Sequence, residues 1–178
     1  MSMILSVLGN SNTGKTTLIT RIVPLLKEKG LQVVIVKHTV RDIDIDREEK
    51  DSWKITQNGA DVVVASPRRM VFIKEEEDDI DAISGKYLKD YDLVITEGFN
   101  RAGKDRIVVL NEPEELERFK HGSIKAVVCD KLCDKHDVLE GYKCFKPHEI
   151  EKIADFIAAL WKDNPQDQPE PVQSQEAF

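Results

Sequence analysis

The sequence has few cysteines, no long apolar run and no excess of basic residues, and each shortage narrows the class of protein. Its 3 cysteines are an odd number, so they do not form a complete disulfide framework. No stretch approaches the ~20 apolar residues of a membrane helix, and residues 1–8 lack the basic start and cleavage site of a signal peptide. We therefore expect a cytoplasmic protein with reduced thiols and no membrane partner.

Acidic residues outnumber basic ones, which argues against nucleic acid as a partner. The chain has 26 Lys and Arg against 33 Asp and Glu, a formal net charge of -7. Such a field repels a phosphate backbone, so we expect no non-specific binding of nucleic acid. It does not prevent binding of a small nucleotide, because one loop can outweigh the average charge locally.

Short apolar runs alternate with segments of helical spacing along most of the chain. The apolar runs predict buried strands at 3–8, 32–38, 92–96, 106–110 and 124–129, the last of which we take as the final strand. The helical spacing predicts helices at 16–29, 51–58, 79–89, 113–119 and 148–161, and turn residues between 61–66 and 69–74 predict a hairpin. This alternation predicts an α/β fold with a mostly parallel central sheet flanked by helices.

The carboxyl-terminal segment differs in composition from the rest of the chain. Residues 163–178 are rich in Pro, Gln, Asp and Glu and have almost no apolar side chains. Such a segment cannot offset the entropy of ordering, so we predict a disordered tail. Residues 1–162 are expected to form one domain.

The segment from Gly9 to Thr16 reads GNSNTGKT and matches the phosphate-loop pattern G-x-x-x-x-G-K-[ST] at every fixed position. The glycines allow backbone angles that point several amides at one anion, and the following helix adds its positive end. Lys15 supplies a charge for the β- and γ-phosphates, and the Thr16 hydroxyl is an oxygen ligand for Mg²⁺. A predicted strand precedes the loop and a helix follows it, so we expect a P-loop NTPase fold that binds a nucleoside triphosphate with Mg²⁺. The residues predicted to bind it here are Gly9, Asn12, Thr13, Gly14, Lys15, Thr16 and Thr17.

Two further polar residues stand at the carboxyl ends of predicted strands. The carboxyl ends of parallel strands meet at one edge of a sheet, which places Gly9, His38 and Glu97 along one rim. A phosphate loop needs a second carboxylate to hold the metal's water shell or orient an attacking water, and Glu97 is our candidate. The alternative for Glu97 is a surface charge that ends a strand. His38 is predicted to contact phosphate or substrate, and its alternative is an ordinary strand-end histidine.

The segment after His38 adds more carboxylates. Asp42, Asp44, Asp46 and Asp51 all lie in or beside a polar stretch without periodicity. Each has the chemistry to bind the Mg²⁺ shell. Acidic surface loops are common, however, so spacing alone does not select one of them.

The order of these motifs resembles one family. After the phosphate loop come Lys37-His38, Asp46, Lys50-Asp51-Ser52-Trp53, Asn58-Gly59-Ala60-Asp61 and Glu97-Gly98-Phe99. This combination resembles the MobB family, molybdopterin-guanine dinucleotide biosynthesis protein B, over roughly residues 3–110. The resemblance implies a dimeric P-loop protein that binds GTP and hydrolyses it weakly. It also implies a partner, the MobA guanylyltransferase, which attaches GMP to molybdopterin.

The resemblance also implies roles for single residues. By position, Asp46 and Asp51 match acids of the family's second motif, and Glu97 matches its strand-end acid. We therefore expect Lys15, Glu97 and Asp46 to be catalytic. Thr16, Glu97 and Asp46 are expected to hold Mg²⁺, and His38 and Asp51 to contact the nucleotide.

The sequence departs from the family pattern at three places. Thr39-Val40-Arg41 stands where members often have a second histidine, and Asn100 with Arg101 stands where a lysine commonly follows Glu-Gly-Phe. The region of Asp130 has no clear Asn-Lys-x-Asp guanine signature. The preference for guanine therefore rests on the resemblance.

Two other functions remain open. One is a small-molecule kinase or ligase of the same fold, with fast turnover. The other is a metal-delivery NTPase that uses Cys129, Cys133 and Cys144 near His136 and His148. The cysteines include no C-x₂-C pair and match no standard zinc spacing, so we interpret them as ordinary thiols.

Slow hydrolysis is expected because no arginine finger or water-positioning glutamine is evident. Arg101, Lys104 and Arg106 are interpreted as rim residues for substrate or partner phosphates.

Overall fold

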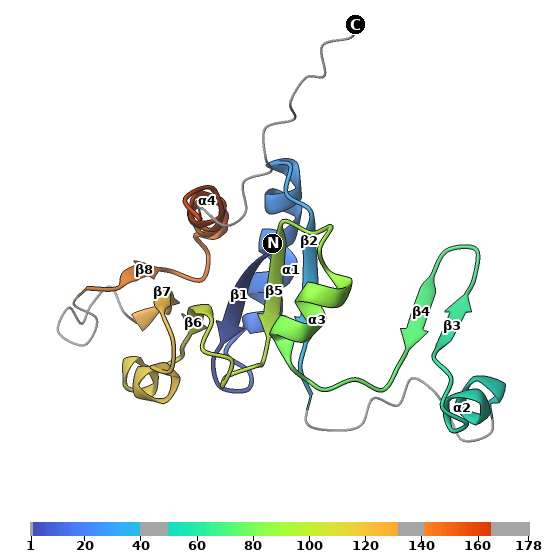
Figure 1. The fold of residues 1–178 in the computed structure, drawn as a ribbon. Coiled ribbons are helices and arrows are strands. Elements are labelled where there is room, and N and C mark those ends of the chain that lie inside the picture. The colour runs from blue at the N-terminus through green and yellow to red at the C-terminus, as the bar shows by residue number, and fades with distance from the viewer. Residues whose placement is uncertain (1, 40–49, 132–140, 165–178) are drawn as a thin grey trace, which may run out of the picture. The chain divides into compact units, whose positions relative to one another are not determined.

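A computed structural model describes residues 2–39, 50–131 and 141–164. The described residues form two compact units, one running to His38 and resuming at Ile80, the other lying between Thr39 and Asp79. The first unit contains a six-stranded sheet in the order β2-β5-β1-β6-β7-β8 (Figure 1). Its strands are β1 (Met3–Leu8), β2 (Val33–Lys37), β5 (Leu93–Glu97), β6 (Asp105–Val109), β7 (Ile124–Val128) and β8 (Lys143–Phe145).

Neighbouring strands of this sheet all pair in parallel. Four helical segments accompany them: α1 (Lys15–Glu28), α3 (Ile80–Tyr87), the 3₁₀ helix η1 (Pro113–Phe119) and α4 (Ile150–Lys162). The predicted α/β fold with a mostly parallel sheet is confirmed. All carboxyl ends of the strands therefore lie at one edge of the sheet.

Helices cover both faces of the sheet (Figure 1). On one face, Ile22 of α1 and Ile153 of α4 share a fully buried cluster with Leu5 of β1. On the other face, Ile80 of α3 packs with Val94 of β5. Alternate residues of β5 thus bury on opposite faces, with Leu93 and Ile95 on one and Val94 on the other, which is why this strand is mostly apolar.

Helix α1 continues through Pro24. It ends in a Schellman motif, in which the Gly30 amide donates to Lys27 O (2.9 Å) and the Leu31 amide to Leu26 O (3.2 Å). Gly30 takes the left-handed conformation that this ending requires, with φ 89°. Helix α1 therefore begins directly after Gly14 of the phosphate loop and ends at Glu28, one residue before the predicted end.

The expectation that 124–129 is the final strand is wrong, because β8 follows it. The strand has only 3 residues, Lys-Cys-Phe, and one of them is buried. It forms through its register with β7, where Val127 pairs with Cys144. Local propensity carries no signal for so short an edge strand.

The second unit contains α2 (Asp51–Thr56) and an antiparallel hairpin of β3 (Val62–Ala65) and β4 (Met70–Ile73). The predicted hairpin is confirmed. Its turn is held by Ser66, whose hydroxyl donates to Arg69 O (3.0 Å). The hairpin exposes large apolar side chains, including Met70 at 71% and Phe72 at 46%.

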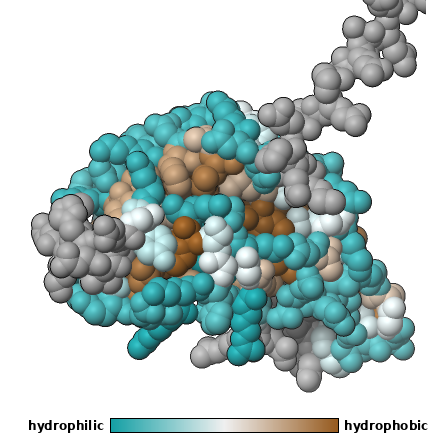
Figure 2. Space-filling model, turned by 60° about the vertical axis from the view of Figure 1, so that its left-hand side comes forward, coloured by the Kyte–Doolittle hydropathy of each residue, from teal (hydrophilic) through white to brown (hydrophobic). Residues whose placement is uncertain are grey.

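Residues 165–178, most of the predicted tail, lie outside the described part of the chain. Among the helices that are described, none is long and apolar enough to span a membrane. The face drawn in Figure 2 is mostly hydrophilic, with apolar side chains visible between polar ones.

Candidate phosphate-binding site

The loop from Gly9 to Gly14 connects β1 to α1 and depends on unusual backbone angles. Gly9 has φ 151° and Gly14 has φ 90°, and Asn12 is one of few non-glycine residues with positive φ, at 62°. A Cβ atom on Gly9 would lie 2.2 Å from Val109 O and 2.8 Å from Thr13 Oγ1. Glycine at position 9 is therefore required by space as well as by conformation.

An open pocket of about 490 Å³ lies between the loop, the start of α1 and Glu97. Its lining residues are Ser11, Asn12, Gly14, Lys15, Thr16, Thr17 and Glu97. The volume lies within the range of small-molecule sites. The first amides of a helix have no acceptor within the helix, so this pocket presents amide donors and the positive helix end to an anion.

Two side-chain contacts organise the pocket. The Lys15 ammonium donates to Asn10 O (2.6 Å), and the Thr16 hydroxyl donates to Glu97 Oε1 (3.0 Å). The second contact follows from the sheet, because Val7 of β1 pairs with Glu97 of β5 and brings the carboxylate beside the loop. A hydroxyl and a carboxylate so placed are both hard oxygen donors, which fit Mg²⁺.

His38 lies beside Glu97 but is not among the residues that line the described pocket. Its amide donates to Glu97 O (2.9 Å), and its ring packs on Phe99 with centroids 4.7 Å apart. Gly98 permits this approach, since a Cβ there would lie 2.7 Å from His38 Cβ. The Glu-Gly-Phe motif thus holds β5 and the end of β2 together.

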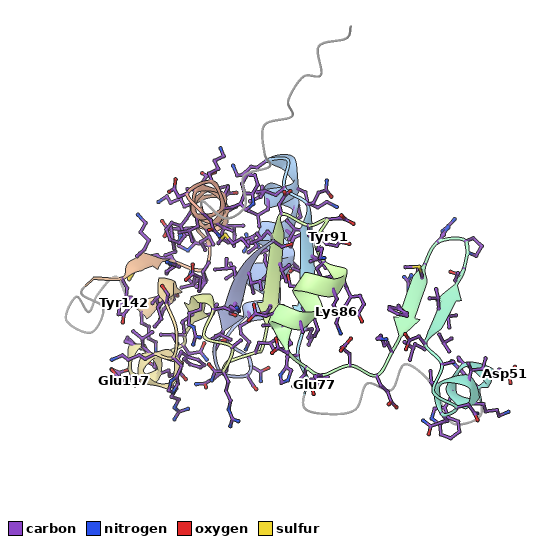
Figure 3. All side chains as sticks on the ribbon, viewed as in Figure 1. Asp51, Glu77, Lys86, Tyr91, Glu117 and Tyr142 are labelled. Carbon is purple, nitrogen blue, oxygen red and sulfur yellow. The ribbon has the colours of Figure 1, made fainter. Side chains whose placement is uncertain are left out.

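The predicted acids after His38 lie either outside the described residues or in the second unit. Asp42, Asp44 and Asp46 lie outside the described part of the chain. Asp51 begins α2 in the second unit (Figure 3), where its Oδ1 is 3.8 Å from Lys54 Nζ. Their roles in nucleotide and metal binding remain predictions.

The two described cysteines, Cys129 and Cys144, differ in burial. Cys129 is fully buried with its Sγ 3.7 Å from Asn111 O, and Cys144 is half-buried. Cys133 and His136 lie outside the described residues. Within the described ranges, no group of three or more His, Cys, Asp or Glu residues is arranged to hold a metal ion.

Arg106 is not a rim residue, contrary to the interpretation from sequence. It is 0% exposed in β6, where its guanidinium donates to Phe119 O (3.0 Å) and Lys104 O (3.2 Å). Burial lowers the pKa of Arg106. Lys104 is held by an ion pair with Asp81 of α3. Arg101 is exposed.

Sequence reasoning missed two residues at the loop. The Asn10 side chain donates through Nδ2 to Glu115 Oε1 (2.5 Å), which joins the loop to η1. Asn10 occupies a variable position of the pattern, and Glu115 is 105 residues away in sequence. The spacing of Glu112 and Glu115 is a sequence signal for a capping box at the start of η1. It predicts the start of a helix but gives no indication of a contact with the loop.

A parallel sheet with helices on both faces and a glycine-rich loop between β1 and α1 defines a P-loop NTPase fold, which binds nucleotides. A family model, "Molybdopterin guanine dinucleotide synthesis protein B" (MobB), matches residues 4–130. The chain belongs to the MobB family, whose role is in molybdopterin-guanine dinucleotide biosynthesis. The resemblance of the motifs is thereby confirmed.

Individual relatives agree with this assignment. The chain is 31% identical over 158 residues to the molybdopterin-guanine dinucleotide biosynthesis adapter protein of Escherichia coli (strain K12), covering 83% of this chain and 86% of that one. A crystal structure of molybdopterin-guanine biosynthesis protein B is 50% identical, with TM-score 0.75, covering 90% and 100% of the two chains. The structure of Bacillus subtilis MobB is 26% identical, with TM-score 0.71 and coverage of 88% and 96%.

Proposed function

We propose that this protein binds Mg²⁺-GTP at the phosphate loop and acts as an adapter for attachment of GMP to molybdopterin. Its partners in this proposal are molybdopterin and the MobA guanylyltransferase, and its place is the cytoplasm. The observation that carries the proposal is the convergence of Lys15, Thr16 and Glu97 on one pocket. Family membership supplies the pathway.

Within this proposal, each group of the pocket has a distinct task. The amides at the start of α1 and the Lys15 ammonium bind the β- and γ-phosphates. Thr16 and Glu97 hold Mg²⁺, which neutralises phosphate charge when it is bound. We extend the site to Asp46, Asp51 and His38 on the family pattern alone.

Weak hydrolysis is part of the proposal, and the lining of the pocket supports it. Among the described lining residues, Lys15 is the one cation, and glutamine is absent. Efficient GTP hydrolysis uses an arginine or a water-positioning group at the transition state. We therefore infer that the site mainly holds GTP for the partner reaction.

A homodimer is also proposed. A two-stranded hairpin is only marginally stable in water, and β3 and β4 expose Val63 at 55% as well as Met70 and Phe72. Apolar side chains grouped on one small element favour burial against another protein surface. Sedimentation of the wild-type protein tests the assembly directly.

The proposed function is tested by calorimetry with GTP, ATP and CTP in the presence of Mg²⁺, followed by steady-state phosphate release. We expect GTP to bind at least about tenfold more tightly than the other two and turnover to stay far below ~10 s⁻¹. Addition of purified MobA and molybdopterin is then expected to increase dinucleotide formation. Fast turnover without partners would instead favour a kinase or ligase.

A further inference from the structure

Asn10 connects the phosphate loop to a carboxylate outside it. Its side chain donates to Glu115 Oε1 (2.5 Å), while its carbonyl oxygen accepts from Lys15 Nζ (2.6 Å) and from Thr13 Oγ1 (3.0 Å). Asn10 and Glu115 are both half-buried. A single residue therefore links the loop's cation to Glu115 through two short contacts.

The carboxylate of Glu115 is itself held by the backbone. Its Oε2 accepts from the amides of Asn111 (3.1 Å) and Glu112 (3.4 Å) at the start of η1. Burial alone would raise the pKa of Glu115, but the hydrogen bonds from Asn10, Asn111 and Glu112 outweigh it and the pKa is lowered. Glu115 is thus ionised at neutral pH, with an oxygen fixed toward Asn10.

The segment that carries Glu115 is anchored to the sheet. Leu116 and Phe119 of η1 are buried with Val108 of β6. The buried Arg106 donates to Phe119 O, and Lys131 after β7 forms an ion pair with Glu112. Such a segment provides a fixed support rather than a mobile contact.

We propose that Glu115 is a positioning residue for the phosphate loop, acting through Asn10 to fix the loop for nucleotide binding. An ionised carboxylate near a triphosphate repels it, so Glu115 does not serve to attract the ligand. Its contribution is geometric, because it orients the residue whose carbonyl holds Lys15. This inference rests on the proposed function in that the loop must bind a nucleotide.

The test exchanges the charges of the pair. Asn10→Asp places two carboxylates in contact and is expected to weaken Mg²⁺-GTP binding about tenfold or more, measured by calorimetry. In Asn10→Asp/Glu115→Gln, the side-chain amide introduced on η1 can donate to the carboxylate introduced on the loop, and the net charge of wild type is kept. We expect the affinity of this double variant to return to within about threefold of wild type.

The matched control is Asn10→Asp/Glu117→Gln. Glu117 (Figure 3) lies on the same 3₁₀ helix and is exposed. It pairs with Lys120, so its change removes the same charge without touching the loop. Rescue by the Glu115 change alone supports the proposal. Equal rescue by both changes, or rescue by neither, would overturn it.

A double-mutant cycle with Asn10→Ala and Glu115→Ala covers the case in which Asn10→Asp fails to fold. If Glu115 acts through Asn10, the double variant binds GTP no more weakly than the worse single variant. A double variant whose loss of GTP affinity is the product of the two single losses would overturn the inference. Wild-type protein that binds none of the three nucleotides would overturn the proposed function, whereas normal wild-type binding with no coupling would overturn this inference alone.

Discussion

The phosphate loop of the first unit and the hairpin of the second unit differ in what determines their structure. In the loop, the residue type at a position is restricted by the backbone angles, by close neighbours and by side-chain contacts. Gly9 is an example, because there is no space for a Cβ atom at this position. In the hairpin, Val63, Met70 and Phe72 are exposed, and the turn depends on Ser66. The hydrogen bonds described for the loop come from residues of its own unit, while the hairpin exposes the apolar side chains that we propose to be buried in a homodimer. Substitutions in the two regions should therefore change different properties.

The largest effect is expected from Gly9→Ala. A methyl group there meets Val109 O at 2.2 Å, and β6 cannot shift without disturbing the sheet. We expect a loss of about 3 kcal/mol in the free energy of unfolding and no measurable GTP binding. Urea denaturation and calorimetry measure the two effects.

The matched substitution in the second unit is Gly59→Ala. Gly59 also has positive φ, at 84°, but apart from its own chain neighbours no atom of the described residues lies within 4 Å of the position of its Cβ. The cost is expected to be about 1 kcal/mol, from backbone conformation alone. An equal loss at both positions would contradict the difference between the two units.

A smaller effect is expected from Glu97→Gln. The change keeps the shape of the side chain but removes the charge beside the Thr16 hydroxyl. GTP binding should weaken about tenfold with Mg²⁺ present and less in EDTA, because the metal contact is lost. Asp130→Asn is the control, since Asp130 is an exposed carboxylate just after β7 and does not line the described pocket.

In the hairpin, Met70→Ser/Phe72→Ser should affect assembly instead of nucleotide binding. Removal of these exposed apolar side chains is expected to raise the dimer dissociation constant about tenfold, measured by sedimentation, with GTP affinity unchanged. Tyr87→Ser is the control, because it removes a large side chain exposed at 42% on α3. It should change neither the dimer dissociation constant nor the GTP affinity. A weaker GTP affinity in the hairpin variant would contradict the separation of roles.

The smallest effect concerns pH. The pKa of Glu115 is lowered in the folded protein. Its contribution to the free energy of unfolding is therefore fully present above the ordinary glutamate pKa and is lost as pH falls through the lowered value. In that acidic window, Glu115→Gln should unfold with a shallower pH dependence than wild type. Thermal unfolding of wild type and Glu115→Gln at several pH values measures the two slopes, and equal slopes would contradict this role of Glu115.

Much of the first unit was predictable because its signals are local. An apolar strand, a glycine-rich loop and a helix follow one another directly, and the parallel sheet then brings Glu97 to the same edge. The short strand β8, the burial of Arg106 and the contact between Asn10 and Glu115 were not predictable. Each depends on pairing or packing between residues distant in sequence, which composition and spacing do not encode.

The central claim is that the loop binds Mg²⁺-GTP through Lys15, and calorimetry of wild type and Lys15→Ala tests it most directly. Lys15 Nζ contacts only the loop's own Asn10 carbonyl among the hydrogen bonds of the described residues, so the fold should survive its removal. We predict at least about a hundredfold loss of GTP affinity with an unchanged circular dichroism spectrum. Unchanged GTP affinity in a folded Lys15→Ala protein would contradict the account.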